Sequence, residues 1–257
     1  MQMAKMGNLV AATHQAVSFH PAMVRIPEAE AVFWPGCALM TLEGHILDRT
    51  LEVLRGAEPE MQMAFACCAN PSSCLFPGKA EKRKNLLLRE IQKKGVKRIY
   101  TACPNCTLQL RAFGLEVIPI WPVLAQHLTA EDMVPLGGRY VWHDPCPTRK
   151  DAVQQEAVRR ILALRGCDWM EPECSGCRTQ CCGNVKMLHC TDPVKSAALR
   201  KKRLAQLPPE RIISSSCEGC LSAFRSEKRE TAHLLEMLFG RSKSRGWGNR
   251  FRNTWKK

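Results

Sequence analysis

The chain has 257 residues, of which 45% are hydrophobic and 6% aromatic, with 15 cysteines and a formal net charge of +14. This length is enough for one large domain or two small ones with cores of their own. It contains no apolar run of roughly eighteen residues, so we expect no transmembrane helix. The first ten residues lack the basic and apolar segments of a signal peptide. We therefore expect a cytoplasmic protein with reduced thiols, because a disulfide scaffold is typical of small secreted chains.

In the first half, hydrophobic spacing and turn residues predict strands and helices in alternation. Residues 1–30 lack clear periodicity and are interpreted as a loose arm. The predicted elements that follow are a strand at 31–37, a helix at 41–55, a short strand at 61–66, a loop at 70–73, a helix at 79–94, a strand at 96–102, a helix beginning at Pro104, a strand at 115–120 and a helix at 122–129.

The second half repeats this plan. Its predicted elements are a strand and turn at 139–146, a helix at 151–165, a cysteine-rich loop at 174–190, a helix at 192–206 and a strand at 211–216. Alternating strands and helices favour an α/β fold of two pseudo-symmetric repeats, each a small, mainly parallel sheet flanked by helices, with cysteines at strand ends. The predicted domains are an arm at 1–30, a first repeat at 31–134, a second repeat at 139–240 and a basic aromatic tail at 241–257.

Ten of the cysteines form one pattern twice: a single cysteine, a Cys-Cys pair and a CxxC pair. The first copy is Cys37, Cys67, Cys68, Cys103 and Cys106; the second is Cys146, Cys181, Cys182, Cys217 and Cys220. Adding 114 to the last four numbers of the first copy gives the last four of the second. Such a repeat indicates that one unit was duplicated and that each unit gathers five thiolates.

Five sulfur ligands suit iron and sulfide better than one zinc ion, which four ligands satisfy. Adjacent cysteines bind two neighbouring irons more readily than one iron. Both CxxC pairs are predicted where a strand ends and a helix begins, and the unpaired N–H groups of a helix N-terminus can donate to an anionic centre. The pattern therefore favours a polynuclear metal centre in each repeat.

The residues around these cysteines resemble the cysteine-rich CCG domain family. Phe33-Trp34-Pro35-Gly36-Cys37 is similar to that family's opening segment, His143-Asp144-Pro145-Cys146 to the start of its second repeat, and Cys181-Cys182-Gly183 is the CCG signature. The domain occurs in the B subunit of heterodisulfide reductase and in related subunits of anaerobic glycerol-3-phosphate dehydrogenase, glycolate oxidase and lactate utilisation. The resemblance spans about residues 31–240, and Ala69 departs from it where the family has glycine.

The resemblance implies one or two [4Fe-4S] clusters, of the non-cubane kind held by five cysteines. It implies an oxidoreductase subunit that relays electrons to a disulfide or another acceptor within a hetero-oligomeric complex. The chain lacks a ferredoxin-like run of cysteines, so a ferredoxin-like or flavoprotein subunit would be the donor. Some relatives bind zinc or a simpler cluster in one repeat, and the alternative is a zinc-stabilised structural subunit that anchors a larger dehydrogenase.

Further cysteines lie close to the second copy of the pattern. Cys174, Cys177 and Cys190 are candidates for extra ligands or a zinc clamp, with spare thiols as the alternative. His143 lies near the expected centre, and we interpret it as a side chain that orients a turn by hydrogen bonding rather than as an iron ligand.

Half of the net charge comes from seven basic residues in the last seventeen. Trp247, Phe251 and Trp255 recur there every fourth residue, which on a helix would suit a membrane surface or a partner's groove. Gly246 and Gly248 argue against a helix, so a disordered tail is the alternative. Because the excess charge is partly in the tail, we expect no nucleic acid as partner.

Overall fold

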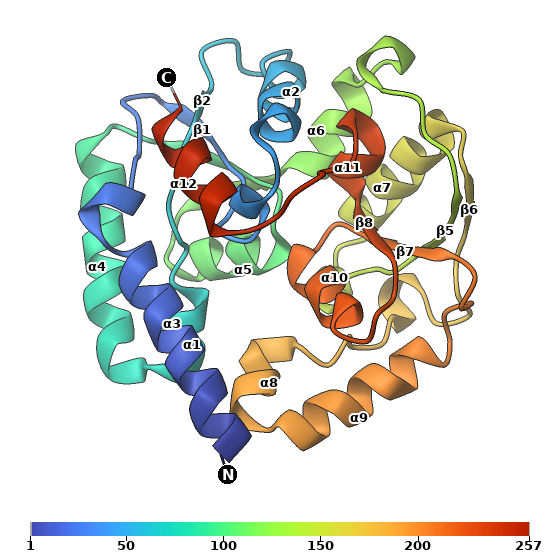
Figure 1. Cartoon of the computed structure of the whole chain (residues 1–257). Coiled ribbons are helices and arrows are strands. Elements are labelled where there is room, and N and C mark those ends of the chain that lie inside the picture. The colour runs from blue at the N-terminus through green and yellow to red at the C-terminus, as the bar shows by residue number, and fades with distance from the viewer. Residues whose placement is uncertain (1, 257) are drawn as a thin grey trace. The chain divides into compact units, whose positions relative to one another are not determined.

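The computed structural model describes residues 2–256 and divides them into two compact units. Unit 1 comprises residues 1–120 and 242–257, and unit 2 comprises residues 121–241. Figure 1 shows that each unit contains a small sheet with helices around it. No described helix is both long and apolar enough to cross a bilayer.

Unit 1 is built on a parallel sheet of four strands in the order β2-β1-β3-β4. The strands are β1 (Ala31–Trp34), β2 (Gln62–Met63), β3 (Arg98–Thr101) and β4 (Glu116–Pro119). The main helices that connect them are α2 (Gly44–Leu54), α3 (Asn70–Leu75), α4 (Pro77–Lys93) and α5 (Pro104–Ala112). Because all four strands are parallel, their carboxyl ends lie along the same edge of the sheet.

Unit 2 repeats this topology, with a parallel sheet in the order β6-β5-β7-β8. The strands are β5 (Arg139–Trp142), β6 (Asp168–Met170), β7 (Ile212–Ser215) and β8 (Thr231–His233). The main helices are α6 (Ile120–His127), α7 (Ala152–Arg165), α8 (Leu188–Thr191), α9 (Pro193–Leu204), α10 (Glu218–Arg225) and α11 (Leu234–Phe239). The predicted α/β fold of two pseudo-symmetric repeats is confirmed.

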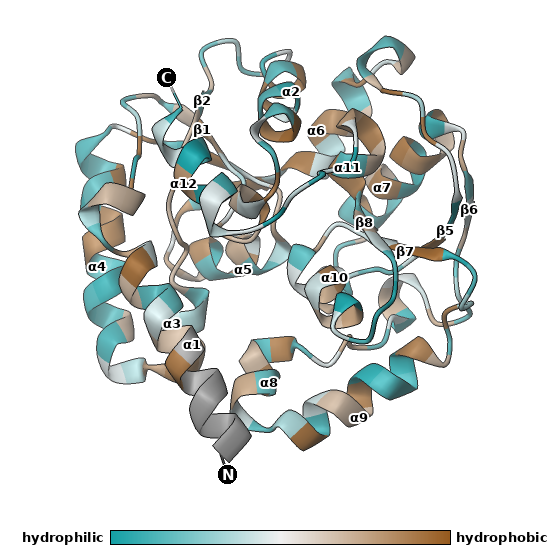
Figure 2. Cartoon of the chain, in the orientation of Figure 1, coloured by the Kyte–Doolittle hydropathy of each residue, from teal (hydrophilic) through white to brown (hydrophobic). Residues whose placement is uncertain are grey.

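Helix α4 turns one apolar face inward, as its sequence spacing requires. Leu87 and Ile91 of α4 are buried, whereas most of its other side chains are charged, and the chain leaves this helix through Gly95 at φ +68°. Figure 2 shows the resulting mixture of teal and brown along α4. The central strand β1 is buried at all four residues, as expected for a strand covered by helices, whereas the edge strands β2 and β6 have no buried residue.

The predicted loop at 70–73 is wrong, because these residues begin helix α3. Pro71 lies in its first turn, where a missing backbone N–H costs nothing and the fixed φ favours a helix. The Asn-Pro-Ser-Ser sequence therefore starts a helix instead of interrupting one.

The expectation of a loose N-terminal arm is wrong for residues 2–18, which form helix α1 (Gln2–Ser18). Ala11, Gln15 and Ser18 are buried, and α1 packs against α3. Two of these three buried residues are polar, so the described part of the inner face of α1, from Ala11 to Ser18, has no apolar stripe.

The C-terminal tail forms helix α12 (Trp247–Trp255) within unit 1, so the alternative of a disordered tail is wrong. Its buried face is polar, and Asn253 Nδ2 donates to the carbonyl oxygens of Met40 and Leu42, both at 2.9 Å. Its aromatic face is exposed, with exposed fractions of 46% for Trp247, 56% for Phe251 and 48% for Trp255. This helix therefore buries its polar face and exposes its apolar face, whereas an ordinary surface helix does the reverse.

The boundary between the units lies between residues 120 and 121, and the last sixteen residues belong to unit 1 again. The two predicted repeats leave residues 135–138 between them. The predicted repeat boundaries, 31–134 and 139–240, stay predictions because they describe sequence repeats rather than compact units.

Candidate metal centres

In unit 1, five cysteines occupy the carboxyl ends of neighbouring strands. Cys37 follows β1 after a turn at Gly36, and Cys103 follows β3, which pairs with β1. Cys103 is also the N-cap residue of α5, which places Cys106 in the first turn of that helix. The Cys67-Cys68 pair lies between β2 and α3. Parallel strand ends and one helix N-terminus therefore bring the whole set together.

The thiols of unit 1 form a continuous chain of sulfur contacts. Cys37 contacts Cys67, Cys67 contacts Cys68, Cys68 contacts Cys106, and Cys106 contacts Cys103. The turn before the first cysteine runs close to the last pair: a Cβ at Gly36 would lie 3.0 Å from Cys106 Sγ. Gly36 also has φ +86°, so glycine is needed there for conformation and for space.

Unit 2 repeats the same order of contacts with the equivalent residues. Cys146 contacts Cys181, Cys181 contacts Cys182, Cys182 contacts Cys220, and Cys220 contacts Cys217. The Sγ atoms of Cys182 and Cys220 are 3.2 Å apart. Cys217 is the N-cap residue of α10, as Cys103 is of α5. The structure thus brings together all ten cysteines of the repeated pattern, five in each unit.

In each unit the first cysteine of the Cys-Cys pair has a pKa below its ordinary value, because its neighbours favour the thiolate form. Hydrogen bonds from Cys146 and Cys182, followed by the backbone N–H of Gly183 at 3.3 Å, lower the pKa of Cys181 to about 2. Cys67, its equivalent, has a pKa well below the ordinary value because Cys37 and Cys68 donate to it. Since thiolates are the metal-binding form of cysteine, the sites are electrostatically suited to cations.

Six other thiols have raised pKa values and favour the protonated form: Cys37, Cys68, Cys106, Cys146, Cys182 and Cys220. A hydrogen bond to Cys181 and then burial raise the pKa of Cys146. The contact with Cys181 raises the pKa of Cys182 to about 12, with burial adding to the effect. Several thiolates cannot accumulate in one buried site without cations to offset their repulsion. Metal binding would therefore release protons from these groups.

His143 lies beside two of these cysteines. One of its ring nitrogens and the sulfurs of Cys182 and Cys220 lie within 4.8 Å of one another. The residue is fully buried, its Nδ1 accepts from Arg203 Nε at 3.1 Å, and its ring meets Phe224 edge to face. The expectation that His143 is held by hydrogen bonding agrees with this geometry.

The three candidates for extra ligands lie in the loop and helix that follow β6. Cys177 is exposed, Cys190 is buried in α8, and Cys174 Sγ accepts from Gln180 Nε2 at 3.7 Å. Within the described residues, the group of donor atoms around Cys182 and Cys220 includes none of these three. Their role as extra ligands stays a prediction.

Sequence reasoning missed several polar residues that surround the first site. Gln15 of α1 donates to Cys67 Sγ at 3.6 Å and accepts from Ser72. Arg250 of α12 is fully buried and its guanidinium lies 3.2 Å from His14 Nε2. These residues come from the segments interpreted as an arm and a tail. No local motif marks them, because only the folded chain brings them to the cysteines.

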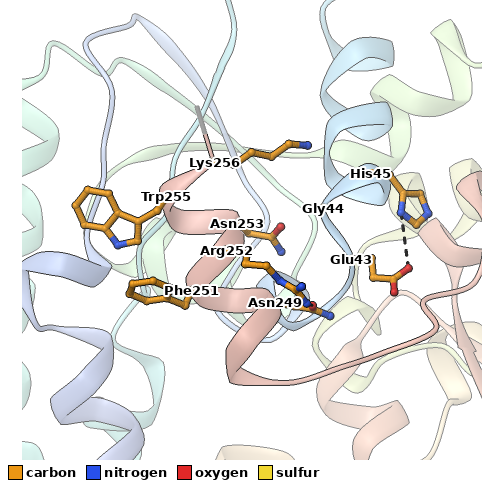
Figure 3. Close-up of a pocket in the computed structure, with 9 residues that line it drawn as sticks. All are labelled: Glu43, Gly44, His45, Asn249, Phe251, Arg252, Asn253, Trp255 and Lys256. Carbon is orange, nitrogen blue, oxygen red and sulfur yellow. Dashed lines mark hydrogen bonds and ion pairs between the residues drawn. The ribbon is translucent and has the colours of Figure 1, made fainter.

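A pocket of unit 1 lies away from the sulfur atoms. It is lined by Glu43, Gly44, His45, Asn249, Phe251, Arg252, Asn253, Trp255 and Lys256, and includes no cysteine. Figure 3 shows Glu43 and His45 facing each other on one side, and the side chains of α12 on the other. Its mixed charges offer no metal-binding arrangement, so the cysteine sites remain the candidate functional sites.

Comparison with known proteins gives one informative match. The model of a family described as "CCG: Cysteine-rich domain" matches residues 31–111 and 140–225, which together contain all ten cysteines of the repeated pattern. No curated protein matches the chain.

Solved structures that resemble the chain are distant. The Picrophilus torridus aspartate racemase is 9% identical and has a TM-score of 0.33, with 88% of this chain and 100% of that chain covered. An aspartate racemase homologue from Pyrococcus horikoshii is 11% identical with a TM-score of 0.32, covering 82% and 96%. The allantoin racemase from Klebsiella pneumoniae is 12% identical with a TM-score of 0.31, covering 82% and 85%. Likenesses this weak carry no functional argument.

Proposed function

Because the chain belongs to the CCG cysteine-rich domain family, we propose that it is an iron–sulfur oxidoreductase subunit of the heterodisulfide-reductase type. Each unit would hold one [4Fe-4S] cluster, of the non-cubane kind, through its five cysteines. The family match and the clustered thiols indicate metal binding in any case.

The observation that carries this proposal is the identical order of sulfur contacts in the two units. Five thiols exceed the four ligands of a structural zinc ion, whereas a cluster of several irons can use all five. Two adjacent cysteines at the middle of each chain of contacts also suit two neighbouring metal ions better than one. The donor set therefore fits an iron–sulfur cluster.

The protein's own contribution would be to bind the cluster and to shield it from water. Among the ligands, Cys67, Cys68, Cys106, Cys182, Cys217 and Cys220 are buried. The N-termini of α5 and α10 direct unpaired backbone N–H groups and partial positive charge toward the sites, which favours anionic sulfur. When bound, the cluster would supply one-electron transfer.

The wider role proposed here is electron relay within a hetero-oligomeric complex. A ferredoxin-like or flavoprotein subunit would supply electrons, and a disulfide or another acceptor would receive them. Partially exposed ligands such as Cys37 and Cys146 offer a route for exchange with a partner or substrate.

The deciding experiment is a measurement of iron, acid-labile sulfide and zinc per chain on anaerobically purified protein, with EPR of the same sample. We expect about four or eight irons with matching sulfide, as one or two four-iron clusters require, and an EPR signal unlike that of a cubane. Zinc without iron would contradict the redox role and support the zinc-stabilised anchoring subunit instead.

A further inference from the structure

A buried arginine fixes the orientation of the His143 ring and determines which ring nitrogen carries the proton. Arg203 of α9 and His143, which follows β5, both have exposed fractions of 0%. Arg203 Nε lies 3.1 Å from His143 Nδ1, and Arg203 Nη1 donates to the carbonyl oxygen of Cys174 and to Gln206 Oε1, both at 2.9 Å. A guanidinium has only donors and keeps its charge in proteins, so Nδ1 must be the acceptor.

A neutral imidazole that accepts at Nδ1 carries its proton at Nε2. Because Nδ1 accepts from Arg203, it carries no proton of its own, and a ring with only one N–H is neutral. Nε2 is buried and has no hydrogen-bond partner among the described residues. A buried, unpaired N–H is costly, so this one calls for an acceptor.

The candidate acceptors are the sulfurs of Cys182 and Cys220, which lie within 4.8 Å of a His143 ring nitrogen and of each other. A protonated Nε2 has no lone pair to offer a metal. Nε2 could bind a metal only if the proton moved to Nδ1. The Nδ1–H would then face the N–H of Arg203 Nε, and neither group could accept the hydrogen bond. The same geometry that places the ring beside the thiols therefore prevents it from acting as a ligand.

Unit 1 supports this with a different residue at the equivalent place. Trp34 stands three residues before Cys37, as His143 stands three residues before Cys146. Its indole nitrogen is also buried without a partner, and Trp34 belongs to the same core cluster as Cys68 and Cys106, the equivalents of Cys182 and Cys220. Indole can only donate. Both units thus place an unpaired N–H donor, and no ligand, at this position.

Building on the proposed function, we propose that His143, locked by Arg203, is a positioning residue that donates an N–H···S hydrogen bond to the metal–sulfur centre of unit 2 and does not bind metal. Trp34 has the same role in unit 1. Donation to a ligand or cluster sulfur stabilises the more negative, reduced state. These two residues therefore raise the reduction potentials of their centres.

The first test is the tautomer itself, which does not depend on the metal. Two-bond proton–nitrogen NMR correlations of the metal-depleted full chain, labelled with 15N-histidine, should show His143 protonated at Nε2. Arg203→Gln should shift the ring toward a mixture of tautomers, whereas Arg200→Gln, on the same helix but paired with Glu227, should not. Protonation at Nδ1 in the unaltered chain would overturn the inference.

The second test uses the metal-loaded chain. Electron–nuclear double resonance of the 15N-labelled protein should show weak nitrogen coupling and an exchangeable proton. Strong coupling to a directly bound nitrogen would overturn the inference while leaving the proposed function intact.

Trp34→Phe, which removes the N–H and part of the ring, should leave iron per chain unchanged and shift one midpoint potential to a more negative value. An unchanged potential would overturn the role of Trp34. Absence of bound metal would instead contradict the proposed function without touching the NMR result.

Discussion

Ala69 and Gly183 occupy equivalent backbone positions, each directly after a Cys-Cys pair and each with positive φ, +64° for Ala69 and +88° for Gly183. The left-handed conformation lets the chain turn away after presenting two adjacent sulfurs. Glycine adopts it freely, whereas alanine is strained there. The two repeats thus share a turn that only the second one fills with the favoured residue.

Ala69→Gly should stabilise unit 1 by about 1 kcal/mol, because it removes the strain of a left-handed alanine. Urea unfolding of the metal-depleted chain, followed by tryptophan fluorescence, measures this change. Ala38→Gly is a suitable control, since Ala38 has a right-handed conformation with φ −74°. That control should be neutral or destabilising. Equal effects of both substitutions would contradict the strain at Ala69.

Gly183→Ala should be strongly destabilising. The added Cβ would lie 2.3 Å from the carbonyl oxygen of Ser196 in α9, so backbone would have to move. Gly166→Ala also falls at positive φ but meets open space, and it serves as the matched control. We expect thermal unfolding to show a much larger loss for Gly183→Ala. Similar losses of thermal stability in the two variants would mean that α9 can shift to make room and that the close contact has little effect on stability.

Removing one buried cysteine should remove one centre and leave the other. Cys182→Ala is expected to lower iron and sulfide by the amount bound in unit 2, and Cys68→Ala by that bound in unit 1. Cys74→Ala, outside the repeated pattern, is the control and should keep the full content. If unit 2 holds the reactive cluster, Cys182→Ala also abolishes activity. Retained activity would exclude catalysis at that unit.

Asp144 should contribute stability that disappears in acid. Burial raises the pKa of its carboxyl, but hydrogen bonds from Arg159, the Gly176 N–H and Trp142 outweigh burial, so the net pKa lies below the ordinary 3.8. A lowered folded-state pKa means that this contribution is complete above the unfolded value and is lost as pH falls through the folded one. The relevant window is therefore below about pH 4.

Asp144→Asn should cost about 2 kcal/mol at pH 7, because it weakens the charge-assisted hydrogen bond from Arg159 at 2.7 Å, while Arg159 keeps its second partner Glu171 at 2.8 Å. Unfolding measured from pH 7 to pH 3 should show a smaller loss with acid in the variant than in the unaltered chain. Parallel curves would show that Asp144 is not the group responsible.

The exposed aromatic face of α12 is expected to contact an anionic membrane surface. Phe251 and Trp255 are half-exposed, and Arg25, Arg252 and Lys256 lie near them, an arrangement typical of interfacial helices. Flotation with phosphatidylserine vesicles should recover the chain at low salt. Phe251→Ser with Trp255→Ser should abolish recovery, and Val194→Ser, an exposed apolar control in unit 2, should not. Failure of the unaltered chain to float would exclude this role.

The sequence by itself determined the duplicated α/β plan and the ten cysteines. Strand ends, helix starts and cysteine spacings are local features, and Pro104 after Cys103 marks a helix start without reference to the rest of the chain. Parallel strands then carry those cysteines to a common edge. The site's composition was therefore predictable from position and residue type.

Only the tertiary structure decided what surrounds those sulfurs. Gln15 and Arg250 reach the first site from opposite ends of the chain on helix faces held by polar contacts. The aromatic spacing of the tail marks only the exposed face of its helix. Likewise, nothing near His143 in the sequence indicates that Arg203, 60 residues away, sets its tautomer. Hydrogen-bond partners distant in sequence are chosen by packing, because directional bonds depend on where atoms lie rather than on residue order.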